Sequence, residues 1–173
     1  FTQQRSLLPT GTIRCRSPAA GALHHLIADH VVQGRVIFPG AGYLEMARAA
    51  GAMALHGIYF LQPLAIEGGD LSVECALSDG RFEVRSGASE ATEVATVHCS
   101  GDVAGAYGWL RIDHPSVCGC PHAADVDSLY NGFHVVGLQY GPGYRTLVQA
   151  WGGASNALAR LRARSTREGT QVH

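Results

Sequence analysis

Residues 42–55 constrain the fold more than any other part of this sequence. They read Gly-Tyr-Leu-Glu-Met-Ala-Arg-Ala-Ala-Gly-Ala-Met-Ala-Leu, which is rich in small residues and apolar on nearly every side. A helix with this pattern is buried, and its small side chains would let a sheet wrap closely around it. Pro39 suits the first helical position, because the N–H that proline lacks would have no partner there. We therefore predict a buried helix over residues 39–55.

The hydrophobic period changes after Gly57. Short runs in which apolar residues alternate with polar or small ones follow at residues 58–66, 71–77, 81–85 and 91–103. Runs of this length are typical of antiparallel strands, and Ser78-Asp79-Gly80 between two of them is typical of a tight turn. A buried helix followed by such a meander predicts the α+β class, with an antiparallel sheet curled around the helix.

The rest of the chain is more irregular. Residues 1–22 are interrupted by several Pro and Gly residues and are expected to be irregular, with one alternating run at 12–16 that is consistent with a strand. We divide the chain into an N-terminal domain over 1–104, a linker over 105–124, and the start of a second domain over 125–173. In this last part we expect a capped helical turn at 125–130, a Gly/Pro loop at 137–144, and strands at 147–151 and 156–164.

Composition excludes several classes of function. The 173 residues carry a net charge of -1, so nothing favours binding to nucleic acid or to an acidic membrane surface. No run reaches the roughly 18 apolar residues of a membrane-spanning helix. Five cysteines form no regular framework, which favours reduced thiols and hence a cytoplasmic location.

The most informative motif runs from His30 through Gly34 to Pro39, with the spacing H-x-x-x-G-x-x-x-x-P. An imidazole suits proton abstraction because its pKa lies near working pH. Gly34 would let the backbone turn closely beside a substrate. The Pro-Gly pair would open the buried helix, so that N–H groups near Gly40 and Ala41 point out of its positive end. Negative charge developing on a substrate oxygen would be stabilised there.

Other stretches carry a family resemblance in the same order. His98-Cys99-Ser100-Gly101 follows the motif, and Leu129-Tyr130 precedes Gly137-Leu138-Gln139-Tyr140-Gly141-Pro142-Gly143-Tyr144. With the histidine motif, these stretches resemble the polyketide synthase dehydratase family over residues 22–173, with Tyr144 where phenylalanine is usual. The resemblance implies a double hotdog fold, two fused helix-wrapping sheets that share one active site. This chain would hold the first hotdog and the beginning of the second.

The resemblance also implies a reaction, the removal of water from a 3-hydroxyacyl thioester to give a 2,3-unsaturated product. His30 would be the base, and Tyr140, Gly141 and Pro142 would line the substrate channel. The acid would be an aspartate in a stretch resembling H-P-x-x-x-D. His173 resembles the histidine of that stretch, so we expect the aspartate beyond it and expect these 173 residues alone to be inactive.

The same resemblance implies partners and no cofactor. The substrate would be carried on the phosphopantetheine of an acyl carrier protein, with neighbouring synthase domains as further partners, and a homodimer is compatible with it. Glu45 is interpreted as a structural residue. A cluster of potential metal ligands, His114, Cys118, Cys120 and His122, does not predict a metal site, because C-x-C is not the usual C-x-x-C spacing of zinc sites.

Three alternatives remain open at the level of sequence. One is a product-template-type cyclase on the same fold, which would fold a poly-β-keto chain. Another is a catalytically inactive hotdog that serves as a scaffold in a megasynthase. A stand-alone hotdog thioesterase or hydratase is the third, and the partial second hotdog argues against it.

Overall fold

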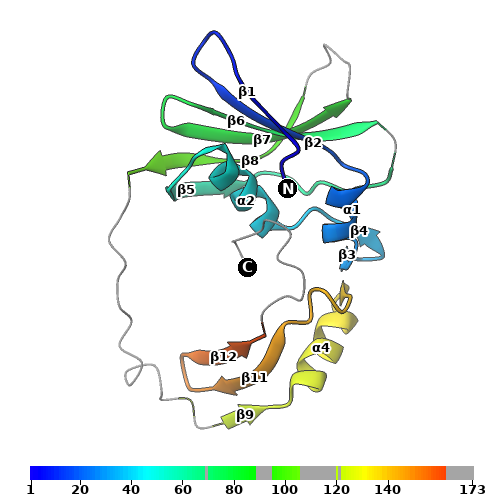
Figure 1. Cartoon of the computed structure of the whole chain (residues 1–173). Coiled ribbons are helices and arrows are strands. Elements are labelled where there is room, and N and C mark those ends of the chain that lie inside the picture. Colours follow the sequence, from blue (N-terminus) through cyan, green and yellow to red (C-terminus); the bar gives the residue numbers. More distant parts are fainter. Residues whose placement is uncertain (69, 89–94, 106–119, 121, 163–173) are drawn as a thin grey trace. The chain divides into compact units, whose positions relative to one another are not determined.

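The structure, a computed structural model, describes residues 1–68, 70–88, 95–105, 120 and 122–162 (Figure 1). These residues form two compact units. The first unit contains residues 1–28 and 35–105 of the described chain, and the second contains Asp29–Gly34 together with 120 and 122–162. The segment that carries His30 therefore belongs to the second unit, although it lies early in the sequence.

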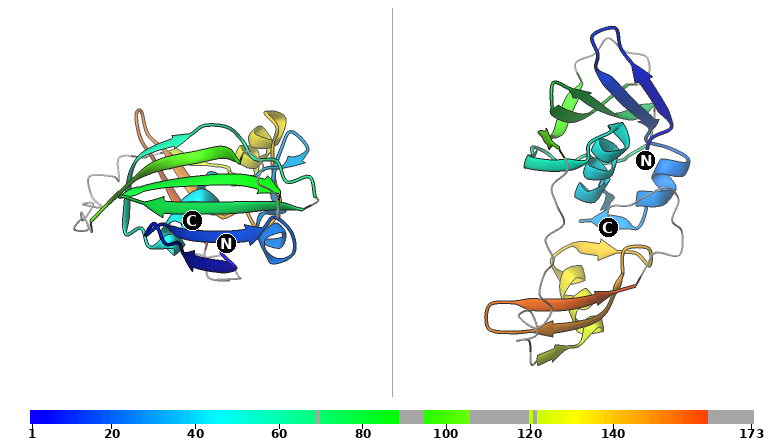
Figure 2. Two further views of the ribbon diagram at one scale, coloured as in Figure 1. Left: turned by 90° about the horizontal axis from the view of Figure 1, so that it is seen from above. Right: turned by 60° about the vertical axis from the view of Figure 1, so that its left-hand side comes forward.

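The first unit is built on a six-stranded antiparallel sheet with the strand order β1-β2-β6-β7-β8-β5 (Figures 1 and 2). Its strands are β1 (Gln4–Leu7), β2 (Ile13–Pro18), β5 (Ala54–Phe60), β6 (Leu71–Ser78), β7 (Arg81–Ala88) and β8 (Thr96–Ala104). The unit also holds helices α1 (Ala22–Ile27) and α2 (Gly40–Ala50) and the short strand β4 (Arg35–Val36).

The turn between β6 and β7 confirms the tight hairpin that the sequence predicts. Asp79 and Gly80 both have positive φ, 50° and 72°, and Ser78 pairs with Arg81 across the turn. Two consecutive residues with positive φ match the right-handed twist of the flanking strands. The alternation along β7 also holds, because Phe82 and Val84 are buried whereas Arg81 and Glu83 are exposed.

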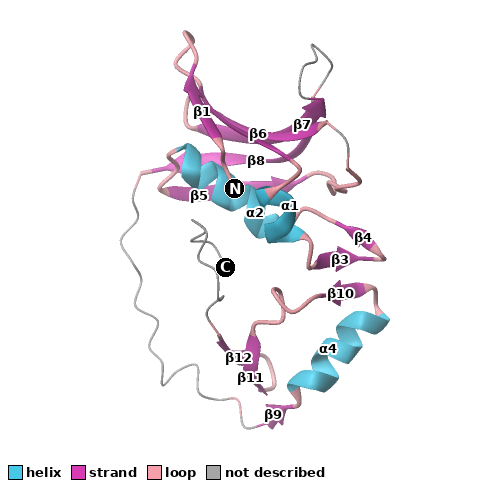
Figure 3. Cartoon of the chain, turned by 45° about the vertical axis from the view of Figure 1, so that its right-hand side comes forward, coloured by secondary structure: helices cyan, strands magenta, loops and turns pink. Residues whose placement is uncertain are grey.

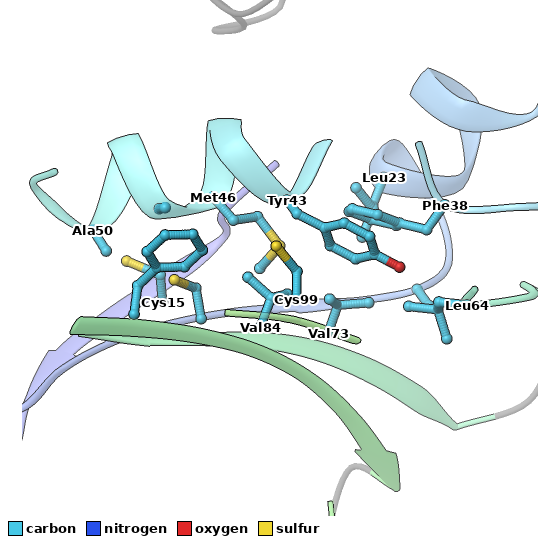
Figure 4. Packing of buried hydrophobic residues seen from close by; sticks show 14 of the residues in the cluster. Cys15, Leu23, Phe38, Tyr43, Met46, Ala50, Leu64, Val73, Val84 and Cys99 are labelled. Carbon is cyan, nitrogen blue, oxygen red and sulfur yellow. The ribbon is translucent and has the colours of Figure 1, made fainter. Parts of the chain in front are cut away.

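The core of the first unit lies between helix α2 and the sheet (Figure 4). Met46, Ala47 and Ala50 face the strands from α2 and are fully buried. The sheet contributes buried side chains from four neighbouring strands, Cys15, Val73, Cys75, Phe82, Val84 and Cys99. Small residues on α2 let the curved sheet approach the helix closely. This arrangement of a sheet wrapped around a helix is the hotdog fold that the sequence predicts.

Two predictions for the first unit are wrong. Helix α2 ends at Ala50 rather than near residue 55, because Gly51 takes a left-handed conformation with φ 119° and its N–H bonds back to the helix. Residues from Ala54 onward then form strand β5. The strand expected at 12–16 is confirmed as β2, whereas β1, which pairs with it, lies in a part predicted to be irregular. Residues 91–94 of the predicted strand 91–103 lie outside the described residues.

The described residues of the second unit form the helix α4 and several short strands (Figure 3). Its elements are β3 (His30–Val32), β9 (His122–Ala124), α4 (Val126–Val135), β10 (Leu138–Tyr140), β11 (Leu147–Gly152) and β12 (Ala157–Leu161). Strand β11 pairs with β12 on one side and β9 on the other, while β10 pairs with β3. Asp125 caps α4 by accepting a hydrogen bond from the N–H of Asp127, which confirms the predicted capped turn. Strand β9 lies inside the stretch that the sequence assigns to a linker.

Candidate active site

Strand β3 carries the motif histidine and ends in a tight turn. Gln33 and Gly34 both have positive φ, 50° and 77°, so a glycine at the second position avoids the strain that a side chain would introduce. The N–H of Gln33 donates to the carbonyl oxygen of Gly137 at 2.7 Å, and the N–H of Gly34 donates to Oε1 of Gln139 at 2.8 Å. The turn after the histidine is thus fastened to residues that lie more than a hundred positions later in the chain.

Strand β10 brings the second motif to the first. β3 and β10 pair antiparallel, and Tyr140 lies directly opposite His30. The imidazole stacks on the Tyr140 ring, with centroids 5.3 Å apart and planes 24° apart. The Tyr144 ring lies 5.1 Å from the imidazole on a tilted plane. Two aromatic rings therefore flank His30, and the second of them, Tyr144, was not among the predicted site residues.

A wider aromatic cluster supports these rings. Phe133 on α4 meets Tyr140 edge to face at 6.3 Å and Tyr130 at 5.8 Å. Tyr130 is buried, and its hydroxyl accepts a hydrogen bond from the N–H of Leu147 at 3.0 Å. Aromatic pairs in this geometry stabilise their neighbours beyond the area that they bury. Helix α4 and strand β11 thereby fix the face of the unit on which His30 lies.

The predicted site residues are divided between the two units. His30, Gly34, Tyr140, Gly141 and Pro142 all belong to the second unit. The remaining three, Pro39, Gly40 and Ala41, belong to the first unit at the start of helix α2. The oxyanion role of Gly40 and Ala41 stays a prediction from the sequence.

The start of helix α2 differs by one position from the prediction. Pro39 is the N-cap residue, with an extended backbone at φ -73° and ψ 147°, and Gly40 is the first helical residue. The carbonyl of Pro39 accepts a hydrogen bond from the N–H of Gly42 at 2.8 Å. In a helix the first N–H groups have no acceptor within the helix itself, so those of Gly40 and Ala41 are outside its internal hydrogen bonds.

Two buried titratable side chains of the first unit, Glu45 and His98, have structural surroundings. Glu45 is 2% exposed, and its Oε1 lies 2.8 Å from the guanidinium of Arg48, one helical turn further along α2. His98 is 4% exposed, with Nε2 2.8 Å from Oγ of Ser86. Burial lowers the pKa of His98 below its usual value. These contacts agree with the structural interpretation of Glu45 and give His98 a place in the core.

The described residues include no group of three potential metal ligands close enough to hold an ion. Of the cluster considered in the sequence, His114 and Cys118 lie outside those residues, and Sγ of Cys120 donates to Oδ1 of Asn156 at 3.4 Å. The four cysteines that the structure describes are all free thiols. No helix in the same part of the chain is long and apolar enough to cross a membrane.

Comparison with curated proteins finds polyketide synthases. Over 156 residues the chain is 34% identical to polyketide synthase ThaG of Burkholderia thailandensis, a match that covers 79% of this chain and 3% of that protein. It is 30% identical over 183 residues to polyketide synthase PksM of Bacillus subtilis, covering 93% of this chain and 4% of that protein. The chain thus spans only a few per cent of these large relatives.

Comparison with solved structures finds dehydratase domains. A trans-AT polyketide synthase dehydratase domain from Brevibacillus brevis aligns with a TM-score of 0.82 at 27% identity, covering 98% of this chain and 66% of that one. The dehydratase domain from the CurF module of the curacin polyketide synthase aligns with a TM-score of 0.81, which at 22% identity supports the fold alone.

Two family models match in succession and account for most of the sequence. The model described as polyketide synthase dehydratase domain matches residues 2–92, and the one described as polyketide synthase dehydratase N-terminal domain matches residues 115–173. The first match takes in the histidine motif and the second takes in the strand that pairs with it. This chain belongs to the polyketide synthase dehydratase family.

Proposed function

We propose that this chain takes part in removing water from a 3-hydroxyacyl thioester, with His30 as the general base. The pairing of His30 with Tyr140, which joins the two motifs of the sequence across β3 and β10, is the observation that carries the proposal. The substrate is a 3-hydroxyacyl group on the phosphopantetheine of an acyl carrier protein in the same synthase. The second unit is then the beginning of a second hotdog.

The reaction needs one proton acceptor and one proton donor. The imidazole of His30 takes the proton from the α-carbon, and the electron pair of that C–H bond forms the new double bond. The β-carbon–oxygen bond breaks, and the hydroxyl leaves as water after it receives a proton from an acid. We assign the acid to an aspartate that follows His173 in the natural protein.

The surroundings of His30 suit a base of this kind. Two tyrosine rings restrict the positions of the imidazole. The imidazole therefore loses less conformational entropy when it takes up the orientation needed for proton transfer. No organic cofactor or metal enters the proposed step, because the thioester already acidifies the α-proton.

The test is turnover of a synthetic 3-hydroxyacyl pantetheine thioester by the natural protein that carries this chain, with loss of water followed by mass spectrometry. His30→Ala should lower kcat by about 10²- to 10⁴-fold, the usual contribution of a general base. His134→Ala is the matched control, since His134 is an exposed histidine of the same unit, and it should leave the rate unchanged. An active His30→Ala protein would contradict the proposal, and cyclisation of an unreduced poly-β-keto thioester would favour the cyclase.

A further inference from the structure

Asp29, the residue before His30, makes two contacts with the loop that follows β10. Its backbone carbonyl accepts a hydrogen bond from the N–H of Gly141 at 2.8 Å. Its carboxylate accepts a second one, at 2.7 Å, from the N–H of Gly143 to Oδ2. A charged acceptor makes such a bond about twice as strong as a neutral one. One residue thus holds two N–H groups of a loop that lies 114 positions away in the sequence.

The loop is shaped to enclose this carboxylate. A Cβ added to Gly141 would lie only 2.2 Å from Oδ1 of Asp29, and one added to Gly143 would lie 2.9 Å from Oδ2. Real Cβ atoms essentially never lie under 3.0 Å from another atom, so a side chain at either position would force the Asp29 carboxylate or the loop to shift. The glycines on either side of Pro142 are therefore explained by a contact, in addition to the turn that they form.

That turn carries the two rings that flank the histidine. The N–H of Tyr144 donates to the carbonyl oxygen of Gly141 at 3.0 Å, which closes a four-residue β-turn. Tyr140 precedes the turn and Tyr144 ends it, and both rings lie near the imidazole. Because Asp29 is bonded to His30 along the chain, the residue that fastens the turn and the base move together.

From this geometry we infer that Asp29 is a positioning residue: its carboxylate fixes the Gly141–Tyr144 turn so that Tyr140 and Tyr144 hold the His30 imidazole in its working orientation. The inference rests on the proposed function of His30 for its effect on catalysis. Two arginines hold the same loop by its carbonyl groups, Arg145 at Tyr140 and Arg162 at Pro142. The Asp29 carboxylate holds the loop by an N–H group instead, that of Gly143.

Three variants of the natural protein separate the roles of the carboxylate. Asp29→Ala removes the acceptor, and Asp29→Asn keeps a carbonyl oxygen that can accept the same bond. Gly143→Ala disturbs the same contact from the loop side while leaving the aspartate in the sequence, because its new Cβ would lie 2.9 Å from Oδ2 and the carboxylate or the turn must shift. Asp125→Ala is the matched control, since Asp125 also accepts a backbone N–H in the second unit, at the start of α4.

Two measurements test the positioning role of Asp29 separately from the proposed dehydration reaction. The first is the rate at which diethyl pyrocarbonate modifies His30, measured by peptide mass spectrometry over a range of pH, which needs no dehydration activity. The second is the separate measurement of kcat and KM for dehydration of the pantetheine thioester. Circular dichroism and size-exclusion chromatography check that each variant is folded.

Asp29→Ala and Gly143→Ala should each raise the modification rate of His30 several-fold and lower kcat by roughly 10- to 100-fold with a smaller change in KM. Asp29→Asn should lie between the wild type and Asp29→Ala in both readouts, because it keeps an acceptor for the N–H of Gly143 but loses the charge. Asp125→Ala should resemble the wild type. An unchanged modification rate in Asp29→Ala would overturn the inference, as would an Asp29→Asn protein as impaired as Asp29→Ala, because the charge would then act on His30 directly. A changed modification rate in a protein that never dehydrates the thioester would uphold the positioning and reject the proposed function.

Discussion

At the residue scale, two histidines with the same side-chain chemistry lie in different surroundings. His30 and His98 are both histidines of the family motifs, yet one lies between tyrosine rings and the other is buried in the core. Spacing alone carries no information on burial. The contacts of Asp29 could not be predicted from the sequence for a related reason. Its partners Gly141 and Gly143 are distant in the sequence, and the only available signal was a carboxylate adjoining the motif histidine and two glycines around Pro142.

The buried His98 predicts a dependence of stability on pH. Burial is the largest cause of its lowered pKa, while the carbonyls of Gln62 and Pro63 act in the opposite sense. The folded state therefore favours the neutral imidazole. Because the unfolded chain binds the proton more readily, this contribution to stability is complete above the ordinary histidine pKa of about 6.5 and declines as pH falls from there toward the lower folded-state value.

The measurement is urea denaturation at a series of pH values from about 7.5 to 5. We expect the unfolding free energy to fall through this range, and His98→Asn to flatten the slope. His56→Gln is the control, because His56 is an exposed histidine on the same sheet and should leave the slope as it is. A slope that persists unchanged in a folded His98→Asn protein would assign the pH dependence to other groups.

At the element scale, local patterns predicted the types of most elements and misplaced their ends. The alternation along residues 71–77 and 81–85 matches β6 and β7, where each residue faces either the helix or the opposite side. The small apolar run at residues 42–55 contains one possible stop signal, Gly51, but the apolar residues continue past it without a change of pattern. The helix ends where Gly51 adopts its left-handed conformation. The residues from Ala54 onward then form β5, which pairs with β8.

The pairing of β3 with β10 could not be read from local sequence at all. Each strand is three residues long, and neither has a pattern that names its partner. Only the order of family motifs placed His30 and Tyr140 in one site. A pairing of such high sequence separation depends on the tertiary structure of the whole second unit.

Replacing Gly51 by alanine should lower the stability of the fold, whereas the same replacement at Gly132 should raise it. At φ 119° a side chain strains the backbone even though nothing lies within 4 Å of the added Cβ. Gly51→Ala should therefore destabilise the fold by about 1–3 kcal/mol. Gly132 lies inside helix α4, also with open space around the added Cβ. Gly132→Ala should stabilise that helix by about 0.5–1 kcal/mol, because alanine has the higher helix propensity.

Thermal denaturation followed by circular dichroism tests both changes. The expected result is a lower midpoint for Gly51→Ala and an unchanged or higher one for Gly132→Ala. Equal midpoints for Gly51→Ala and the wild type would mean that the helix end can adopt another conformation at no cost.

At the scale of the whole molecule, the described parts of the two units differ sharply in how many hydrophobic side chains they bury. The first unit holds nearly all the buried hydrophobic side chains that the structure describes, gathered between α2 and the sheet. In the described part of the second unit, only Cys120 and Tyr130 are buried hydrophobic residues. Each fully buried large side chain contributes about 1.5–3 kcal/mol, so the first unit has far more stabilisation of this kind.

This difference predicts unequal protection from hydrogen exchange in the 173-residue polypeptide. Strands β7 and β11 make a matched pair, because each has a hydrogen-bonded neighbour on both sides. The comparison is made at residues 81–86 of β7 and 150–152 of β11, which are paired on both sides, and exchange there reports the free energy of opening each unit. We expect the amides of β7 to exchange more slowly than those of β11, as measured by mass spectrometry of peptic peptides. Equal rates would show that the two units open together, and His30 would then share the stability of the larger core instead of resting on the weaker unit alone.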